Sequence, residues 1–217
     1  MAALFCALAY ASTFIMHIKV GFLTFDIKDA VVTIAGLLFG PIYALVISVT
    51  VALLEFISMG ETGFWGLLMD ILSTATFATT CALIYKYKKN LWGAIIGLLA
   101  SVFAMTAVMV VGNIFITPIY MGVPRAQVLA ILPTLLLPFN FIKAILNSAI
   151  VMILYKPAST AMKAARVLPR SSADNGNTGS KKTIAFSLII SSVALLVGAI
   201  CVVVFFVFLG GSFQIWG

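Results

Sequence analysis

Apolar segments of roughly 20 residues recur along this chain, and they constrain its fold more than any other feature of the sequence. A helix of that length crosses the hydrocarbon core of a bilayer. Hydrophobic residues make up 63% of the 217 residues and charged residues only 9%, whereas soluble domains carry roughly 25% charged residues. The segments lack the apolar–polar alternation of outer-membrane barrel strands. The sequence therefore predicts an all-α integral membrane protein.

Polar and basic connections divide the chain into six predicted spans and a seventh apolar segment. The six spans cover about residues 2–18, 29–39, 42–57, 64–85, 92–116 and 139–155. Residues 117–138 contain four prolines and are interpreted as a folded loop with one short helix. We expect three parts: a six-span membrane domain over 1–157, a basic flexible linker over 158–182, and an additional membrane span with a short tail over 183–217.

Lysine and arginine residues are concentrated in alternate connections. Nine of the 13 lie in residues 86–89 and 156–182. The positive-inside rule places these two connections in the cytoplasm. We therefore expect a multi-pass protein of the cell membrane, with a cytoplasmic N-terminus and with loops 19–28, 58–63 and 117–138 facing outward. The same placement explains the net charge of +7 by membrane topology, so we expect no nucleic-acid partner.

The sequence contains no motif for catalysis or ATP hydrolysis. A Walker P-loop, the H-E-x-x-H motif and the G-x-S-x-G motif are all missing. Cys6, Cys81 and Cys201 lie far apart in apolar segments, without metal-ligand spacing. We expect no enzymatic activity, no cofactor and no metal site.

Polar residues inside the predicted spans gather on the expected outer side. Asn113 lies near the outer end of the fifth span, and Asn140, Lys143 and Asn147 form one stripe on the sixth. Asp26 lies in the first outer loop. A lysine at the centre of a span costs about 2.5–3.5 kcal/mol on insertion, so such residues usually face protein or a cavity. The group indicates an outward-facing pocket for a neutral, hydrogen-bonding solute.

Each of these residues also has a purely structural interpretation. Lys143 extends to the membrane interface in one alternative. Asn113 joins helices by hydrogen bonds in another. Asn147 is deeper, and this joining role suits it better than ligand binding.

The charged residues beside the pocket leave similar alternatives open. Lys28 and Asp29 either cap and anchor the second span or take part in binding. Glu55 and Asp70 lie in the outer halves of their spans and are expected to pair with basic neighbours.

A ridge of small residues runs along the first span. Ala3, Ala7 and Ala11 are spaced by four residues and therefore share one helical face. Such ridges let another helix approach closely, within the same chain or from a partner.

Three motifs in this chain resemble the riboflavin-specific substrate-binding (S) components of energy-coupling factor (ECF) transporters. They are the runs at 25–41 (Phe-Asp-Ile-Lys-Asp through Phe-Gly-Pro), 116–124 (Ile-Thr-Pro-Ile-Tyr-Met-Gly-Val-Pro) and 137–143 (Leu-Pro-Phe-Asn-Phe-Ile-Lys). The similarity extends over about residues 1–157 and agrees with a six-helix S-component bundle. The seventh C-terminal transmembrane helix predicted here departs from the family pattern.

The resemblance implies a function and a set of residues. An S component captures riboflavin from outside and associates with a transmembrane coupling protein and two ATPase subunits. The family's pocket motif carries over to Asn113, Asn140 and Lys143, and its first outer loop to Thr24, Phe25 and Asp26. The family's small-residue ridge for the coupling protein carries over to Ala3, Ala7 and Ala11. The alternatives are an S component for another vitamin and a membrane scaffold without transport function.

Overall fold

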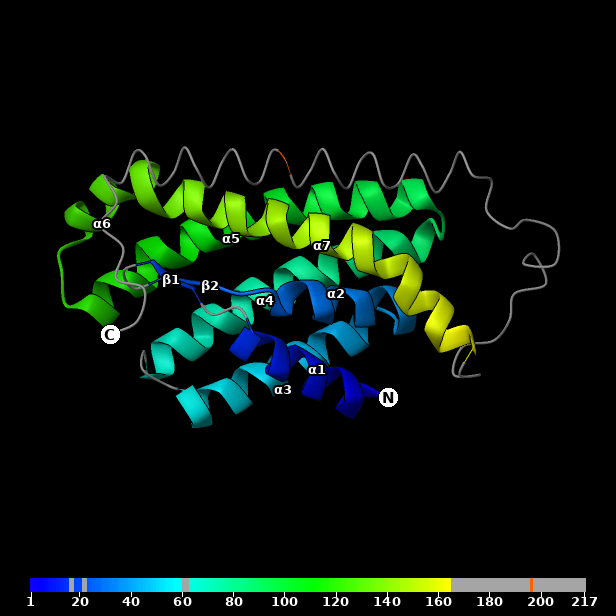
Figure 1. Ribbon diagram of the computed structural model, residues 1–217. Coiled ribbons are helices and arrows are strands. Elements are labelled where there is room, and N and C mark those ends of the chain that lie inside the picture. The colour runs from blue at the N-terminus through cyan, green and yellow to red at the C-terminus, as the bar shows by residue number, and fades with distance from the viewer. Residues whose placement is uncertain (16–17, 21–22, 60–62, 165–195, 197–217) are drawn as a thin grey trace.

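The computed structural model describes residues 1–15, 18–20, 23–59, 63–164 and Leu196. Its elements in chain order are α1 (Ala2–Ile15), β1 (Ile18–Val20), β2 (Leu23–Phe25), α2 (Lys28–Phe39), α3 (Pro41–Met59), α4 (Gly63–Tyr87), α5 (Leu91–Met121), α6 (Arg125–Ile131), the π-helix η1 (Leu132–Leu136) and α7 (Leu137–Ala164). The long helices run along one another, and α6 lies at the end opposite to the N-terminus (Figure 1). The prediction of an all-α bundle is confirmed.

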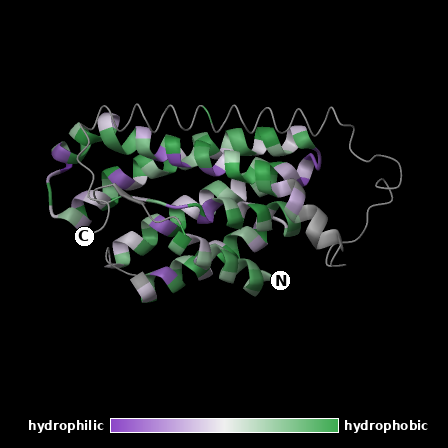
Figure 2. Ribbon diagram, viewed as in Figure 1, coloured by the Kyte–Doolittle hydropathy of each residue, from purple (hydrophilic) through white to green (hydrophobic). Residues whose placement is uncertain are grey.

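Within the described residues, four helical stretches are long and apolar enough to cross a membrane: Pro41–Ser58, Gly63–Tyr87, Leu91–Met121 and Arg125–Tyr155. Hydrophobic residues predominate along them (Figure 2). The apolar helix α1 is shorter, and the 12 residues of α2 rise only about 18 Å. Together with α1 and α2, these stretches account for the six predicted spans.

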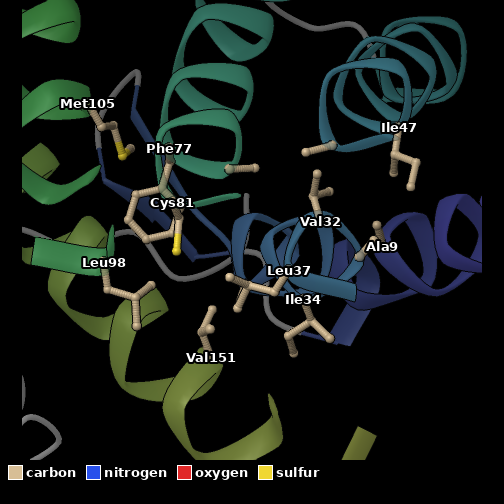
Figure 3. Packing of buried hydrophobic residues seen from close by; sticks show 14 of the residues in the cluster. Ala9, Val32, Ile34, Leu37, Ile47, Phe77, Cys81, Leu98, Met105 and Val151 are labelled. Carbon is tan, nitrogen blue, oxygen red and sulfur yellow. The ribbon is translucent and has the colours of Figure 1, made fainter. Parts of the chain in front are cut away.

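Helix α2 is the centre of the core. It contacts α1, α3, α4 and α7. Figure 3 shows Val32, Ile34 and Leu37 among side chains from those helices and from α5. Lipid tails are as apolar as these side chains, so the packing is stabilised by close van der Waals contact more than by exclusion from water.

Gly36 sets how closely α2 approaches its neighbours. A Cβ atom at this position would lie 2.8 Å from the Cβ of Ala44 on α3 and 3.0 Å from the Cβ of Ala82 on α4. Small residues on all three helices therefore bring the backbones close together near the C-terminal end of α2.

The connection between α1 and α2 contains a β-hairpin that was not predicted from the sequence. β1 and β2 pair antiparallel, with Lys19 opposite Thr24. Leu23 and Phe25 are buried against Val128 of α6 and Leu136 of η1. Strand β2 is therefore packed against protein by these two side chains.

The proline-rich region 117–138 is mostly helical, which corrects its interpretation as a loop. Helix α5 continues through Pro118 to Met121, and α6, η1 and α7 follow almost without interruption. Pro133 and Pro138 are the second residues of η1 and α7 within this continuous stretch, and each lacks the N–H that would bond to the preceding turn. Prolines are tolerated in membrane helices where local π-helical geometry and neighbouring helices satisfy the freed backbone groups, and η1 is such a π-helical turn. Prolines are therefore weaker helix breakers here than we assumed.

The C-terminal boundaries also differ from the prediction. Helix α7 continues through Pro157 to Ala164, so the first residues of the predicted linker over 158–182 are helical. The rest of that linker and the predicted seventh span over 183–217 lie outside the described residues, apart from Leu196.

Candidate ligand-binding site

A cavity of about 200 Å³ lies at the convergence of the hairpin with α2, α3, α4, α5 and α7. Its apolar lining includes Leu23, Trp65, Met69, Met109 and Phe139. Its polar lining includes Thr24, Asp26, Lys28, Glu55, Asp70, Ser73, Asn113, Thr117, Asn140 and Lys143. Apolar walls with a few placed polar groups are typical of small-molecule sites.

Five of the six predicted ligand-binding residues line this one cavity: Thr24, Asp26, Asn113, Asn140 and Lys143. They come from the hairpin, the turn after it, α5 and α7. The sixth, Phe25, is not among the lining residues. Its side chain is 8% exposed and belongs to the apolar cluster that anchors the hairpin. The structure therefore gives Phe25 a packing contact with α6 and η1.

Lys143 is buried and does not extend to the membrane interface. Its Nζ donates to Asp26 Oδ2 at 2.9 Å and to the carbonyl oxygen of Thr24 at 3.4 Å. It also lies 3.6 Å from Asp29 Oδ2. Burial raises the pKa of the Asp26 carboxyl, but the charges of Lys143 and Lys28 outweigh this effect and hold the pKa below its ordinary value. The hairpin is thus tied to α7 by an ion pair at the cavity wall.

Asn147 joins elements beneath the cavity, as expected for a structural amide. Its Oδ1 accepts a hydrogen bond from the backbone N–H of Ala30 in the first turn of α2, which also donates to the carbonyl oxygen of Ile27. Its Nδ2 donates to the carbonyl oxygens of Asp26 and Lys143. Asn147 therefore caps α2 from α7 and does not line the cavity.

Asn113 and Asn140 are buried amides held against their own helices. Each Nδ2 donates at 2.7 Å to a carbonyl oxygen four residues earlier, that of Met109 or Leu136. Asn113 Oδ1 also accepts from the Thr117 hydroxyl. An amide has two donor hydrogens and two acceptor lone pairs, so both side chains keep hydrogen-bonding capacity for a ligand.

A second ion-pair group lines the cavity. Lys28 Nζ bonds to Glu55 Oε2 and lies 2.6 Å from Asp70 Oδ1. The prediction that Glu55 and Asp70 pair with a basic neighbour is confirmed. Asp29 is fully buried and accepts from Thr74 on α4, and it neither lines the cavity nor caps α2 with its side chain.

Several lining residues were not predicted from the sequence, among them Thr117, Ser73 and Trp65. Thr117 follows Asn113 by four positions and Ser73 follows Asp70 by three, so helical periodicity from a predicted residue would have found both. Trp65 carries no such spacing, and only the fold brings it to the cavity.

The alanine ridge faces away from the bundle. Ala3, Ala7 and Ala11 are exposed, whereas Ala9 on the same helix is fully buried. The face is therefore available to another helix, and its role in contacting a coupling protein stays a prediction.

Comparison with known proteins decides the family. The protein-family model described as "ECF transporter, substrate-specific component" matches residues 1–155 of this chain. The chain belongs to this family. S components are substrate-binding transporter subunits embedded in the membrane, and they are not enzymes. Membership of this family explains the long apolar helices of the chain.

Two relatives agree with this assignment. The chain is 29% identical over 167 residues to the riboflavin transporter RibU of Staphylococcus aureus (strain TCH60), covering 72% of this chain and 87% of RibU. A solved structure of the S component of a bacterial ECF transporter matches with a TM-score of 0.63 and 28% identity, covering 75% of this chain and 95% of that chain.

Proposed function

We propose that this S component binds riboflavin in the cavity bordered by the hairpin and α7. The observation that carries the proposal is the buried Lys143, which lines the cavity beside Thr24 and Asn140. The carbonyl groups and ring nitrogens of a flavin require donors, and an ammonium and two amides supply them. Trp65 and Phe139 provide apolar surface for the flavin ring. The similarity to a riboflavin transporter supports this choice of vitamin.

The wider transport cycle follows from the family. The S component captures riboflavin from outside, with its N-terminus in the cytoplasm. It then delivers the vitamin through a transmembrane coupling protein driven by two ATPase subunits. The exposed face of Ala3, Ala7 and Ala11 suits the approach of a coupling helix.

The direct test is a visible absorbance spectrum of the purified protein, followed by a riboflavin titration. We expect bound flavin in the spectrum or saturable binding with one riboflavin per chain. An S component for another vitamin would leave riboflavin unbound while that vitamin bound. A scaffold would bind neither, and a folded protein without saturable riboflavin binding would exclude the proposal.

A further inference from the structure

The group formed by Lys28, Glu55 and Asp70 is a cavity wall distinct from Lys143 and the two amides. Its side chains come from α2, α3 and α4 and all line the cavity. The side chain of Lys28 is 2% exposed, and its ammonium is shared by the two carboxylates. With both carboxylates ionised, this wall carries a net negative charge.

Two hydrogen-bonding atoms of this wall have no partner within the described protein. Glu55 Oε1 is buried and accepts no hydrogen bond, while its Oε2 bonds to Lys28. Ser73 is 2% exposed, lines the cavity, and its Oγ has no partner. Ser73 lies three residues after Asp70, on the same face of α4. Buried polar atoms are nearly always satisfied, so this pair points to hydrogen bonds supplied by a ligand.

We infer that Lys28, Glu55, Asp70 and Ser73 form a subsite for an uncharged polyhydroxyl chain, and that this subsite rejects a phosphate group. The inference rests on the proposed function, in which the hydroxylated chain is the ribityl group of riboflavin. Each hydroxyl both donates and accepts. Glu55 Oε1 accepts from such a group, and Ser73 Oγ donates or accepts as the chain requires.

A phosphate group at the end of the ribityl chain would make unfavourable contacts with this subsite. In their ionised form, Glu55 and Asp70 have no hydrogen to donate, and they oppose phosphate oxygens by charge and by hydrogen bonding. Both carboxylates already pair with the Lys28 ammonium, which is the cation that would otherwise attract the phosphate. Asp26, Asp29 and Lys143 lie near this wall. Together with Glu55, Asp70 and Lys28, they make four carboxyl groups and two lysines. Repulsion between like charges is screened little where water is excluded.

Three flavins separate the contributions in binding titrations: riboflavin, its 5′-phosphate, and lumiflavin, which lacks the ribityl chain. In the wild-type protein we expect riboflavin to bind at least about tenfold more tightly than the phosphate. Ser73→Ala is expected to weaken riboflavin severalfold and to leave lumiflavin unchanged, because only riboflavin reaches Oγ. Glu55→Gln is expected to reduce the ratio of the affinity for riboflavin to the affinity for its 5′-phosphate by about tenfold. The matched control is Ser48→Ala on α3, since Ser48 is also buried but bonds to Ala44 and does not line the cavity.

The outcomes separate this inference from the proposed function. If riboflavin binds but its phosphate binds equally well to the wild-type protein, the subsite is overturned while the proposed function stands. The same holds if Ser73→Ala weakens lumiflavin and riboflavin in parallel, since the effect would then be structural. If no flavin binds the folded protein, the proposed function fails and the subsite fails with it.

Discussion

Lys143→Met is expected to weaken riboflavin binding by roughly 10- to 100-fold, since a hydrogen bond to a charged group contributes about 1.5–3 kcal/mol. The same change removes the cation that pairs with Asp26 and approaches Asp29. Breaking a buried ion pair by removing one partner costs about 3–5 kcal/mol. We therefore expect a lower thermal unfolding midpoint in detergent, with riboflavin titrated well below that midpoint.

A double variant separates binding from stability. Asp26→Asn combined with Lys143→Met removes one of the unpaired carboxylates, so we expect it to recover part of the unfolding midpoint. Riboflavin binding should stay weak, because the lysine donor is still missing. A folded Lys143→Met protein with wild-type affinity would show that Lys143 only holds the hairpin and does not contact the ligand.

Ala7→Phe is expected to reduce riboflavin uptake by cells roughly tenfold or more while leaving binding by the purified protein unchanged. Ala7 is the middle residue of the exposed alanine ridge on α1. A phenyl ring there separates two closely packed helices, and each 1.4 kcal/mol lost from the contact lowers complex formation about tenfold. Uptake is measured with labelled riboflavin in cells that rely on this S component.

Ala107→Phe is the matched control for this prediction. Ala107 is also an exposed alanine on an apolar helix, but it lies on α5, away from the ridge. We expect normal uptake for this variant. Equal loss of uptake in both variants would indicate a general effect of a bulky residue, and unaffected uptake in Ala7→Phe would remove the ridge from the coupling contact.

The sequence predicted the bundle and most of the cavity for physical reasons. Apolar length fixes the spans, because lipid leaves backbone groups no partner outside a helix. The spacing of Asn140, Lys143 and Asn147 placed them on one face of α7, and Asn140 and Lys143 do line the cavity. Burial of a lysine required carboxylate partners, and Asp26 supplies one.

The rest depended on contacts between distant segments. The hairpin has only three residues in each strand, and it is held by α6 and η1, which lie about a hundred residues later in the chain. Phe25, which the resemblance placed in the ligand site, packs against Val128 and Leu136 and is not among the residues that line the cavity. The pairing of Lys28 with both Glu55 and Asp70 depends on how α2 packs between α3 and α4, a contact between segments that spacing along the chain does not reveal.

Tryptophan fluorescence tests directly whether riboflavin occupies the cavity beside Trp65. The chain has three tryptophans: Trp65 lines the cavity, Trp92 lies in the first turn of α5, and Trp216 lies outside the described residues. A variant that keeps only Trp65, made by Trp92→Phe and Trp216→Phe, should retain strong fluorescence quenching by riboflavin. Trp65→Phe should lose most of the quenching while flavin fluorescence still reports binding. Unchanged quenching in Trp65→Phe would contradict the account and place the ligand elsewhere.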